Sequence, residues 1–590
     1  MKEPLFTDER NVQILLALLK AHGIRYVVAN PGTNNIPFVS GVQRDPFFIT
    51  HSAVDERHAA YLACGMSVAA NEPVVLSCTG ATASRNYLPA MTEAFYRKIP
   101  LLVITSSHPA YETGHLVAQV TDRTAPPPDT CVFSIQIPPV GTPKDIQVCE
   151  TALNEAILAL KRRGGGPVHI NLVSNFANSF ETETLPEVRC IDRIDCETST
   201  WPVISDGKKI AVLIGSHKRF SDAQQNALDR FLKSYDAVAL VESGSEYSGK
   251  KSVFGSLICS QGGFQRPEYE RLKPDLIVHI GEISADSPTI RFLSGTAPVW
   301  RVSPDGEVRD RLGRLECVFE MAEERFFSHY ASSKKDPSSG NYAILWSSAD
   351  TALRSTIPEL PFSNLWIAKT LSDAIPEGSV LHLGILNSLR SWNVFPAKPG
   401  VEVTANVGGF GIDGCVSSLM GSAIVRPDIL HFGMVGDLAF FYDMNALGNR
   451  HRGKNLRILI VNNGTGGEFN RYESQGSKFG EGVNRFIAAG GHFGNKSTDL
   501  VRHYAQDLGF EYLSATDKTE FAKALPPFVS KKDNRSVIFE CFTDVRDDAK
   551  AAHAVLVLNP PPTTPKSMRN RISSILPKRM KVAIKELVKQ

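Results

Sequence analysis

The chain has 590 residues, which is too long for one hydrophobic core and suggests roughly three or four domains. Apolar residues make up 42% of the sequence and charged residues 21%, as in ordinary globular proteins. The net charge of +2 gives no reason to expect a nucleic acid as partner. No apolar run approaches the roughly 20 residues that span a bilayer, so we expect a cytoplasmic protein.

Two further features agree with this location. An apolar stripe from Val12 to Leu19 has helical spacing and ends at Gly23, which is typical of an amphipathic helix and not of a signal peptide. The ten cysteines are scattered and form no Cys-x-x-Cys motif. This pattern favours free thiols in a reducing compartment over a zinc site or a disulfide framework.

Strand-like apolar runs alternate with helical patterns through most of the chain, which predicts an α/β fold with doubly wound parallel sheets. The predicted strands fall into three blocks. They are 25–29, 74–78, 101–105 and 168–173, then 210–214, 237–241, 276–280 and 299–302, and finally 379–383, 429–435, 457–461 and 536–540. Stretches 181–202 and 331–342 have the composition of linkers, so three domains in series are predicted.

The last thirty residues have a different character. A proline-rich break at 560–565 precedes a segment in which eight lysines and arginines alternate with apolar residues. Such a basic amphipathic helix either packs on its own protein with a solvated basic face or lies on anionic lipid or a partner. An apolar face by itself requires only burial, so packing on the protein is the favoured interpretation and membrane contact the alternative.

The most informative motif joins two strand ends in the last block. His431 to Leu438 and Ile460 to Gly464 are each an apolar strand that runs into a small polar turn, and Asn463 follows Asp437 by 26 positions. Neighbouring parallel strands open their turns at the same edge of a sheet, where ligands bind. An aspartate and an asparagine would then converge at that edge.

Oxygen ligands of this kind predict a magnesium site. Mg²⁺ takes octahedral oxygen ligands, commonly one or two carboxylates together with phosphate oxygens. Asp437, the side-chain oxygen of Asn463, a main-chain carbonyl near Thr465 and a diphosphate would fill such a sphere. Gly436 and Gly464 would allow the backbone to approach the phosphates closely.

This paired motif resembles the Gly-Asp-Gly and Asn-Asn motif of thiamine-diphosphate (ThDP)-dependent enzymes, with Leu438 in place of the commoner third glycine. The variation resembles the MenD (SEPHCHC synthase)-like branch, which is related to acetolactate synthase. The resemblance covers nearly the whole chain. It includes Asn30-Pro-Gly-Thr-Asn-Asn-Ile-Pro37, Asp55-Glu56-Arg57-His-Ala-Ala60, Cys78-Thr-Gly-Ala-Thr82, Phe441-Tyr-Asp-Met-Asn-Ala-Leu447 and, more weakly, Lys273-Pro-Asp-Leu-Ile-Val278.

The resemblance implies a domain order and an assembly. It implies a pyrimidine-binding domain at 1–185, a central α/β domain at 200–332, a diphosphate- and Mg²⁺-binding domain at 360–558 and the basic tail at 560–590. The family builds each site from the pyrimidine domain of one subunit and the diphosphate domain of another. A homodimer or homotetramer with shared active sites is therefore implied.

The resemblance also implies roles for single residues. Glu56 matches the glutamate that bonds N1′ of the aminopyrimidine, so that the 4′-nitrogen can take the proton from C2 of the thiazolium. Ile412, after Gly411, matches the bulky residue beneath the two rings of the cofactor. Thr79, Gly80, Gly436, Asp437, Leu438 and Asn463 complete the implied cofactor contacts, and Gln119 matches a glutamine near the reacting carbon.

The substrate pocket departs from the MenD pattern. MenD-type enzymes bind a multiply anionic acceptor with several arginines. At the matching positions this chain has Asn34, His108, Trp392 and Val407, and Arg390 is nearby. These substitutions make MenD activity itself doubtful. Asn34, His108, Arg390 and Trp392 stay candidates for substrate contact.

Several functions are consistent with these observations. The favoured one is a carboligase that decarboxylates a 2-oxo acid and transfers the acyl-anion fragment to an acceptor. The alternatives are 2-succinyl-5-enolpyruvyl-6-hydroxy-3-cyclohexene-1-carboxylate synthase, an acetolactate-synthase-like enzyme, or a non-catalytic binding protein with the same fold. The sequence leaves open the donor, the acceptor and the presence of a flavin.

Overall fold

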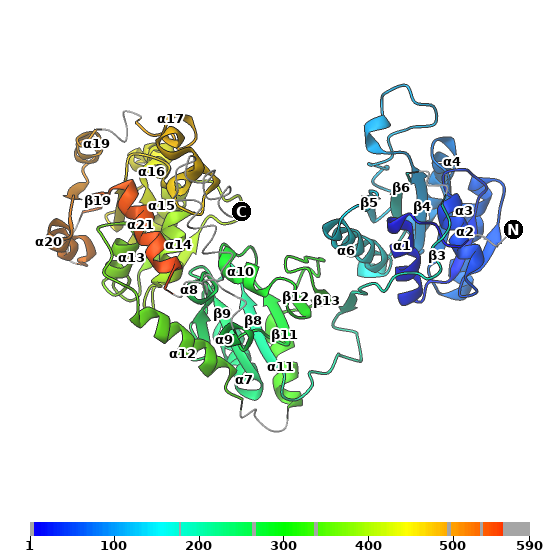
Figure 1. Ribbon diagram of the computed structural model, residues 1–590, viewed down its shortest axis with the longest axis horizontal. Helices are drawn as coiled ribbons and strands as arrows, with labels where there is room; N and C mark the ends of the chain where they lie inside the picture. Colours follow the sequence, from blue (N-terminus) through cyan, green and yellow to red (C-terminus); the bar gives the residue numbers. More distant parts are fainter. Residues whose placement is uncertain are drawn as a thin grey trace, which may run out of the picture. The chain divides into compact units, whose positions relative to one another are not determined.

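The structure is a computed structural model that describes residues 5–175, 179–261, 267–334, 340–491, 497–531 and 535–558. The chain forms two compact units (Figure 1). The first comprises Met1–Pro202 and Val299–Met321, and the second comprises Val203–Pro298 and Ala322–Gln590. The chain thus leaves the first unit, returns to it for one short segment and leaves it again.

The first unit contains a six-stranded parallel sheet in the order β2-β1-β3-β4-β6-β5. The strands are β1 Tyr26–Ala29, β2 Ile49–Ser52, β3 Val74–Cys78, β4 Leu101–Ser107, β5 Phe133–Ile137 and β6 Val168–Val173. The helices are α1 Arg10–Ala21, α2 Ile36–Arg44, α3 Glu56–Ala70, α4 Thr82–Asn86, α5 Leu88–Arg97 and α6 Pro143–Ala159, with short turns η1 Ala110–Glu112 and η2 Arg162–Gly164. Buried residues of α1, α2 and α6 share one apolar cluster with the sheet, and those of α3 and α5 share another.

The second sheet has seven strands in the order β10-β9-β8-β11-β12-β13-β7. The strands are β7 Asp192–Ile194, β8 Lys209–Ile214, β9 Asp236–Val241, β10 Ser252–Phe254, β11 Leu276–Ile280, β12 Val299–Ser303 and β13 Leu315–Glu320. The helices are α7 Asp222–Ser234, α8 Gly255–Cys259, α9 Pro267–Glu270, α10 Ser287–Leu293, α11 Glu323–Ser333 and α12 Tyr342–Ser355.

The third sheet lies wholly in the second unit and has the order β15-β14-β16-β17-β19-β18, again parallel. The strands are β14 Val380–Leu383, β15 Glu402–Ala405, β16 His431–Gly436, β17 Leu456–Asn462, β18 Glu511–Ala515 and β19 Val537–Phe542. The helices are α13 Asn364–Ser372, α14 Asn387–Val394, α15 Cys415–Val425, α16 Asp437–Asp443, α17 Val483–Phe486, α19 Leu500–Asp507, α20 Lys518–Val529 and α21 Val545–Leu556. Short 3₁₀ turns are η3 Met444–Gly448, η4 Gly467–Asn470 and η5 Gln475–Gly482.

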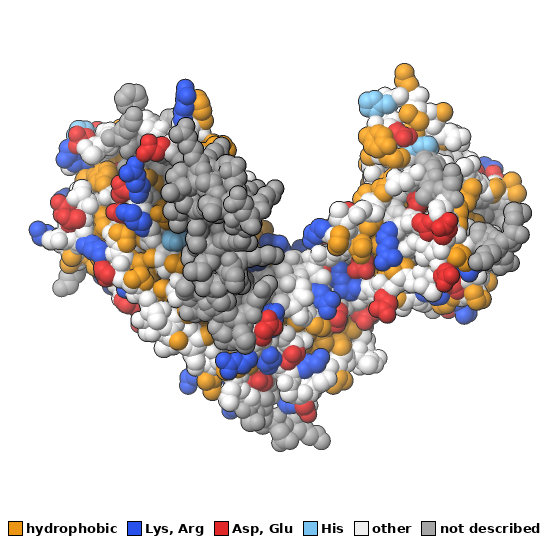
Figure 2. All heavy atoms as spheres, in the orientation of Figure 1, with side chains coloured by type: hydrophobic (Ala, Val, Ile, Leu, Met, Phe, Trp, Pro, Cys, Tyr) orange, Lys and Arg blue, Asp and Glu red, His pale blue; other side chains and the backbone are white. Residues whose placement is uncertain are grey.

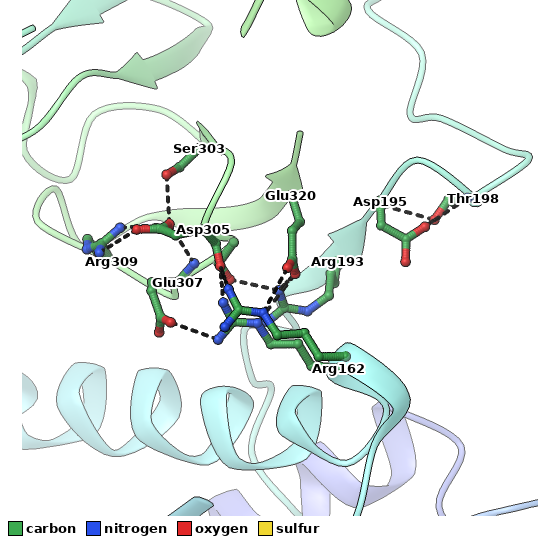
Figure 3. A network of polar contacts seen from close by, with 11 residues as sticks. Arg162, Arg193, Asp195, Thr198, Ser303, Asp305, Glu307, Arg309 and Glu320 are labelled. Carbon is green, nitrogen blue, oxygen red and sulfur yellow. Dashed lines mark hydrogen bonds and ion pairs between the residues drawn. The ribbon is translucent and has the colours of Figure 1, made fainter. Parts of the chain in front are cut away.

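A polar network ties the returning segment to the rest of the first unit (Figure 3). Arg162, just after α6, pairs with Glu307 at 2.9 Å and with Glu320 of β13 at 3.4 Å. Arg193 of β7 pairs with Glu320 at 2.6 Å and donates to the carbonyl of Gly306 at 2.7 Å. Because planar guanidinium groups bond several oxygens at once, two arginines hold the turn between β12 and β13 in place.

The predicted fold class, three parallel α/β sheets, is confirmed. The linker predicted at 181–202 contributes strand β7, and the one predicted at 331–342 overlaps the ends of α11 and α12. The three predicted domain boundaries stay a prediction, and the predicted basic helix of 560–590 lies outside the described residues. All ten cysteines are free. No helix within the described ranges has the length and apolar character needed to cross a membrane.

Candidate active site

Asp437 and Asn463 lie at one edge of the third sheet. Strands β16 and β17 pair in parallel, with Gly436 beside Val461. Asp437 then opens α16, and Asn463 directly follows β17. The backbone N–H of Gly464 donates to Asp437 Oδ2 at 3.0 Å. The two polar turns are therefore held against each other at the carboxyl ends of their strands.

Asp437 is a buried carboxylate, with 3% of its surface exposed. Burial raises its pKa to about 7, backbone N–H groups of Leu438 and Gly464 lower it, and the nearby carboxylate of Asp548 raises it. Among the described residues, no lysine, arginine or histidine forms an ion pair with Asp437. Since an uncompensated buried charge is costly, this environment suits a bound divalent cation.

Asp548 fixes the orientation of the Asn463 amide. Asn463 Nδ2 donates to Asp548 Oδ2 at 2.9 Å, and the carboxylate also accepts from Thr543 Oγ1 at 3.0 Å and from the backbone N–H of Asn364 at 2.7 Å. With its nitrogen engaged by Asp548, Asn463 presents its oxygen on the other side, as a ligand for a hard cation requires. Sequence reasoning did not find Asp548, which lies 85 positions after Asn463.

The backbone around these ligands is tightly fitted. Gly464 has φ +76, a conformation that favours glycine. A Cβ on Gly467 would lie 2.7 Å from Asn463 Nδ2, so η4 passes directly against the ligand amide. The Thr465 hydroxyl donates to Asn484 Oδ1 at 2.9 Å and to the carbonyl of Ala488 at 3.0 Å. The hydroxyl proton of Thr465 is thus engaged within the protein, and the main-chain carbonyl of Thr465 stays the candidate metal ligand.

The four remaining cofactor-binding candidates of the second unit lie in or just before helices α15 and α16. Gly436 immediately precedes α16, and Leu438, in its first turn, is half-buried. Ile412 and Gly411 lie in the loop before α15, and Ile412 packs against the apolar cluster of α15 and α16. Ile412 is only partly buried, so part of its side chain is left to contact a ligand.

Glu56 begins α3 in the first unit. The preceding Asp55 caps the helix by accepting from the backbone N–H of His58 at 2.7 Å. Asn86 Nδ2 donates to Glu56 Oε2 at 3.2 Å, and the carboxyl is half-exposed. One oxygen is thus held by an amide while the group stays accessible to a ligand.

Thr79 and Gly80 follow strand β3, and Gly80 lies against a buried arginine. A Cβ on Gly80 would lie 2.5 Å from Arg123 Nη1, so no larger residue fits there without a shift. Arg123 donates to the carbonyl of Ser106 at 3.2 Å and to Asn171 Oδ1 at 3.0 Å. Burial lowers the pKa of Arg123. Sequence reasoning did not single out this residue.

The substrate candidates of the first unit are spread over two loops. Asn34 is buried, and its Nδ2 has no partner among the described residues. His108 follows β4 and contacts Glu112 Oε2 through Nδ1 at 2.9 Å. Gln119 is exposed, with φ +65, in the same loop. His108 and Gln119 therefore lie in the same loop after β4, whereas Asn34 lies in the loop after β1.

A cavity of about 540 Å³ in the second unit is lined in part by Gly467 and Asp548, both of which lie against the Asn463 amide. Its walls come from α8, α10, α14, α21 and the segment after β17. Arg390 lines it and pairs with Glu468, which sequence reasoning also missed. Trp392, by contrast, is 1% exposed and packs into the protein, away from the lining of this cavity. The volume is typical of a site for a small molecule.

Glu242 is a buried acid just behind this cavity. Its carboxyl accepts from the backbone N–H of Ala285 at 3.0 Å and from Ser284 Oγ at 3.2 Å. Burial and, to a smaller extent, the neighbouring carboxylate of Asp286 raise its pKa to about 8, although the hydrogen bonds with Ser284 and the backbone lower it. Because the folded pKa exceeds the unfolded value, the stability that protonation provides is fully present below pH 4.5 and is lost as the pH rises through 8.

We therefore expect Glu242→Gln to remove this pH dependence. Relative to the wild type, the variant should gain about 2 °C or more in melting temperature between pH 5 and pH 9. Differential scanning fluorimetry at the two pH values measures the gain. Exposed Glu270→Gln is the control and should show no such change. An equal difference at both pH values would contradict the assignment of the raised pKa.

Comparison with known proteins agrees with this geometry. Residues 10–125 match the family model described as thiamine pyrophosphate enzyme, N-terminal TPP binding domain. The 2-succinyl-5-enolpyruvyl-6-hydroxy-3-cyclohexene-1-carboxylate synthase of Bacteroides fragilis is 33% identical over 563 residues, covering 92% of this chain and 98% of that protein. The enzyme of the same name from Phocaeicola vulgatus is 32% identical, covering 92% and 97%.

A solved structure also matches. It is a thiamine-diphosphate-dependent 4-hydroxybenzoylformate decarboxylase from Rhodococcus jostii, at 16% identity and a TM-score of 0.38, covering 90% of this chain and 99% of that one. The curated relatives are far closer. The chain belongs to the family of thiamine-diphosphate-dependent enzymes that includes the 2-succinyl-5-enolpyruvyl-6-hydroxy-3-cyclohexene-1-carboxylate synthases, and the predicted family is confirmed.

Proposed function

We propose that this enzyme binds thiamine diphosphate through Mg²⁺, decarboxylates a 2-oxo acid and transfers the remaining fragment to an acceptor. One observation carries the proposal. Asp437 is a buried carboxylate without a cationic partner among the described residues, and it lies beside an asparagine whose amide is oriented by Asp548. This arrangement provides two oxygen ligands at the strand ends where phosphates and metal ions bind.

Different residues of the chain would bind the metal, the diphosphate and the rings of the cofactor. Asp437, the Asn463 oxygen and the carbonyl of Thr465 would hold Mg²⁺. Gly436 and Leu438 would lie along the diphosphate, with Gly411 and Ile412 under the rings. When bound, thiamine diphosphate would supply a carbon nucleophile for the 2-oxo group and a cationic thiazolium ring that takes up the electron pair left by CO₂.

Glu56 is proposed to form the hydrogen bond to N1′ of the aminopyrimidine that this chemistry requires. Asn86 donates to Oε2 and so leaves the other oxygen free to bond the aminopyrimidine. Thr79 and Gly80, in the loop after β3, would contact the same ring. General acid–base catalysis depends on a positioned group of this kind, and Gln119 is proposed to act near the reacting carbon.

Exposed apolar side chains around Glu56 support a shared-site assembly. Ile49, the one apolar residue of β2, is 38% exposed, Val54 is 84% exposed, and Leu116 in the loop after β4 is fully exposed. Figure 2 shows hydrophobic side chains gathered on the projecting tip of the first unit, over that loop. Exposed apolar surface of this kind marks protein contacts, so we propose a homodimer or homotetramer that covers it.

The acceptor site differs from the MenD pattern. Asn34, His108 and Trp392 stand where arginines are expected, and Arg390 is paired with Glu468. We therefore propose carboligation to an acceptor with fewer negative charges. A cytoplasmic location, the absence of a nucleic-acid partner and the packing of the basic tail stay predictions.

A panel of 2-oxo acids tests the proposed reaction. Purified protein with thiamine diphosphate and Mg²⁺ should release CO₂ from at least one acid, and removal of the metal by a chelator should stop the release. Consumption of isochorismate with 2-oxoglutarate is compared with turnover of pyruvate alone. Efficient use of isochorismate would contradict the proposal of an altered acceptor site. If no 2-oxo acid gave CO₂, the proposed reaction would be wrong.

A further inference from the structure

On the wall of the cavity, the carboxylate of Glu468 is bound to the guanidinium group of Arg390. Glu468, in η4, pairs through Oε2 with Nη1 of Arg390 in α14. In the orientation that satisfies both groups, the Asn387 amide donates to Glu468 Oε2 and accepts from the Glu468 backbone N–H, each at 3.1 Å. The Glu468 carboxylate is thus bound by a guanidinium and an amide, as a carboxylate ligand would be.

This pair lies close to the proposed site of reaction. Gly467 precedes Glu468, and a Cβ on Gly467 would lie 2.7 Å from the Asn463 amide and 3.4 Å from that of Asn387. Both Arg390 and Glu468 line the cavity of about 540 Å³. Their side chains are about one third and one quarter exposed. A substrate group that enters this cavity next to the metal turn therefore meets the pair.

We propose that Glu468 is a specificity-determining residue that excludes dicarboxylic substrates. Its carboxylate takes the place at Arg390 that the distal carboxylate of such a substrate would need, and its negative charge repels that group. The inference rests on the proposed function, and it assigns to this site 2-oxo acids whose distal end is uncharged. A second carboxylate would have to displace Glu468 and leave it without its partner, which disfavours binding.

The other arginines on the wall define the main competing outcome. Arg471 lies 3.5 Å from Glu473, and Arg291 also lines the cavity. If either of them captured a distal carboxylate, the wild-type protein would already bind dicarboxylates well. The proposal requires that it does not.

Binding of unreactive probes tests the proposal without turnover. Glutarate and pentanoate have the same chain length and differ in one carboxylate, and neither has a 2-oxo group. With thiamine diphosphate and Mg²⁺ present, calorimetry should show that Glu468→Gln binds glutarate about 10- to 100-fold more tightly than the wild type, the size of a charge-assisted hydrogen bond. The affinity for pentanoate should change by less than about threefold.

Two further variants secure the interpretation. Glu481→Gln removes a glutamate from another arginine pair, Glu481–Arg546 at 2.9 Å, outside the cavity, and should not change glutarate binding. The double variant Arg390→Gln/Glu468→Gln should not show the gain in glutarate affinity that Glu468→Gln shows. Melting temperatures show that each variant is folded. Tight glutarate binding by the wild type, no gain in Glu468→Gln, or an equal gain in Glu481→Gln would overturn the proposal.

Kinetics then relate the site to the reaction. The ratio of kcat/KM for 2-oxoglutarate to that for 2-oxopentanoate should rise at least about tenfold in Glu468→Gln. If no 2-oxo acid is turned over, the proposed function fails, but the glutarate measurement still decides the role of Glu468. An unchanged ratio in an active enzyme would overturn the specificity role alone.

Discussion

Glu56→Gln is expected to lower the rate of CO₂ release by about 10²- to 10⁴-fold, the usual contribution of a positioned acid–base group. Glutamine keeps the size of the side chain and the contact with Asn86, which donates to Oε2 at 3.2 Å. It cannot hold the proton shared with the aminopyrimidine. Affinity for thiamine diphosphate should therefore fall far less than kcat.

The measurement combines single-turnover CO₂ release with cofactor titration by intrinsic fluorescence. Glu93→Gln is the matched control, because Glu93 lies in the same unit, is exposed and pairs with Arg97 at 3.2 Å. That control should keep wild-type rates. Undiminished turnover in Glu56→Gln would remove Glu56 from the mechanism and leave the family assignment in place.

Asp437→Asn should weaken Mg²⁺-dependent binding of thiamine diphosphate by at least about 100-fold, since replacing a ligating carboxylate with a neutral amide costs more than the 10- to 100-fold typical of an outer-shell change. Asp548→Asn should fall within that smaller range. An amide at 548 cannot accept from both Asn364 and Asn463 as the carboxylate does. The Asn463 amide is then free to turn its nitrogen toward the metal.

In the absence of Mg²⁺, Asp437→Asn is expected to stabilise the protein and not to weaken it. The pKa of Asp437 is raised to about 7 by burial, so at pH 8 its charge destabilises the metal-free protein. Asp437→Asn should therefore melt at a higher temperature than the wild type without Mg²⁺ and gain less on its addition. Exposed Asp428→Asn serves as control. Equal Mg²⁺ affinity in wild type and Asp437→Asn would rule out this metal site.

The strands that sequence reasoning found are all interior strands. Buried on both faces, interior parallel strands form continuous apolar runs, such as Val74–Cys78, in which every residue is buried. The edge strands β2, β5, β7, β10, β15 and β18 were not predicted. Strand β2, Ile-Thr-His-Ser, is exposed throughout, and its short mixed pattern gives no periodic signal. Strand β13, with Glu316 and Glu320 among apolar residues, was missed although it is interior.

The part of the candidate site that could be predicted from the sequence comes from one continuous stretch of the chain. Asp437 and Asn463 follow neighbouring strands of one motif, so their convergence could be inferred from parallel pairing. Asp548 and Glu468 act through contacts that depend on where β19 and α14 pack. No periodicity or spacing predicts such contacts. Arg123 is similar, because its burial under Gly80 depends on how a long loop folds back.

The return of residues 299–321 to the first unit limits how the protein can be divided. A fragment that stopped at Pro202 would lack β12 and β13, and with them the carboxylates that neutralise Arg162 and Arg193. These two guanidinium groups would then lie side by side without counter-charge. Swapping the amino-terminal third between relatives therefore calls for transplanting two separate stretches of sequence, 1–202 and 299–321, together.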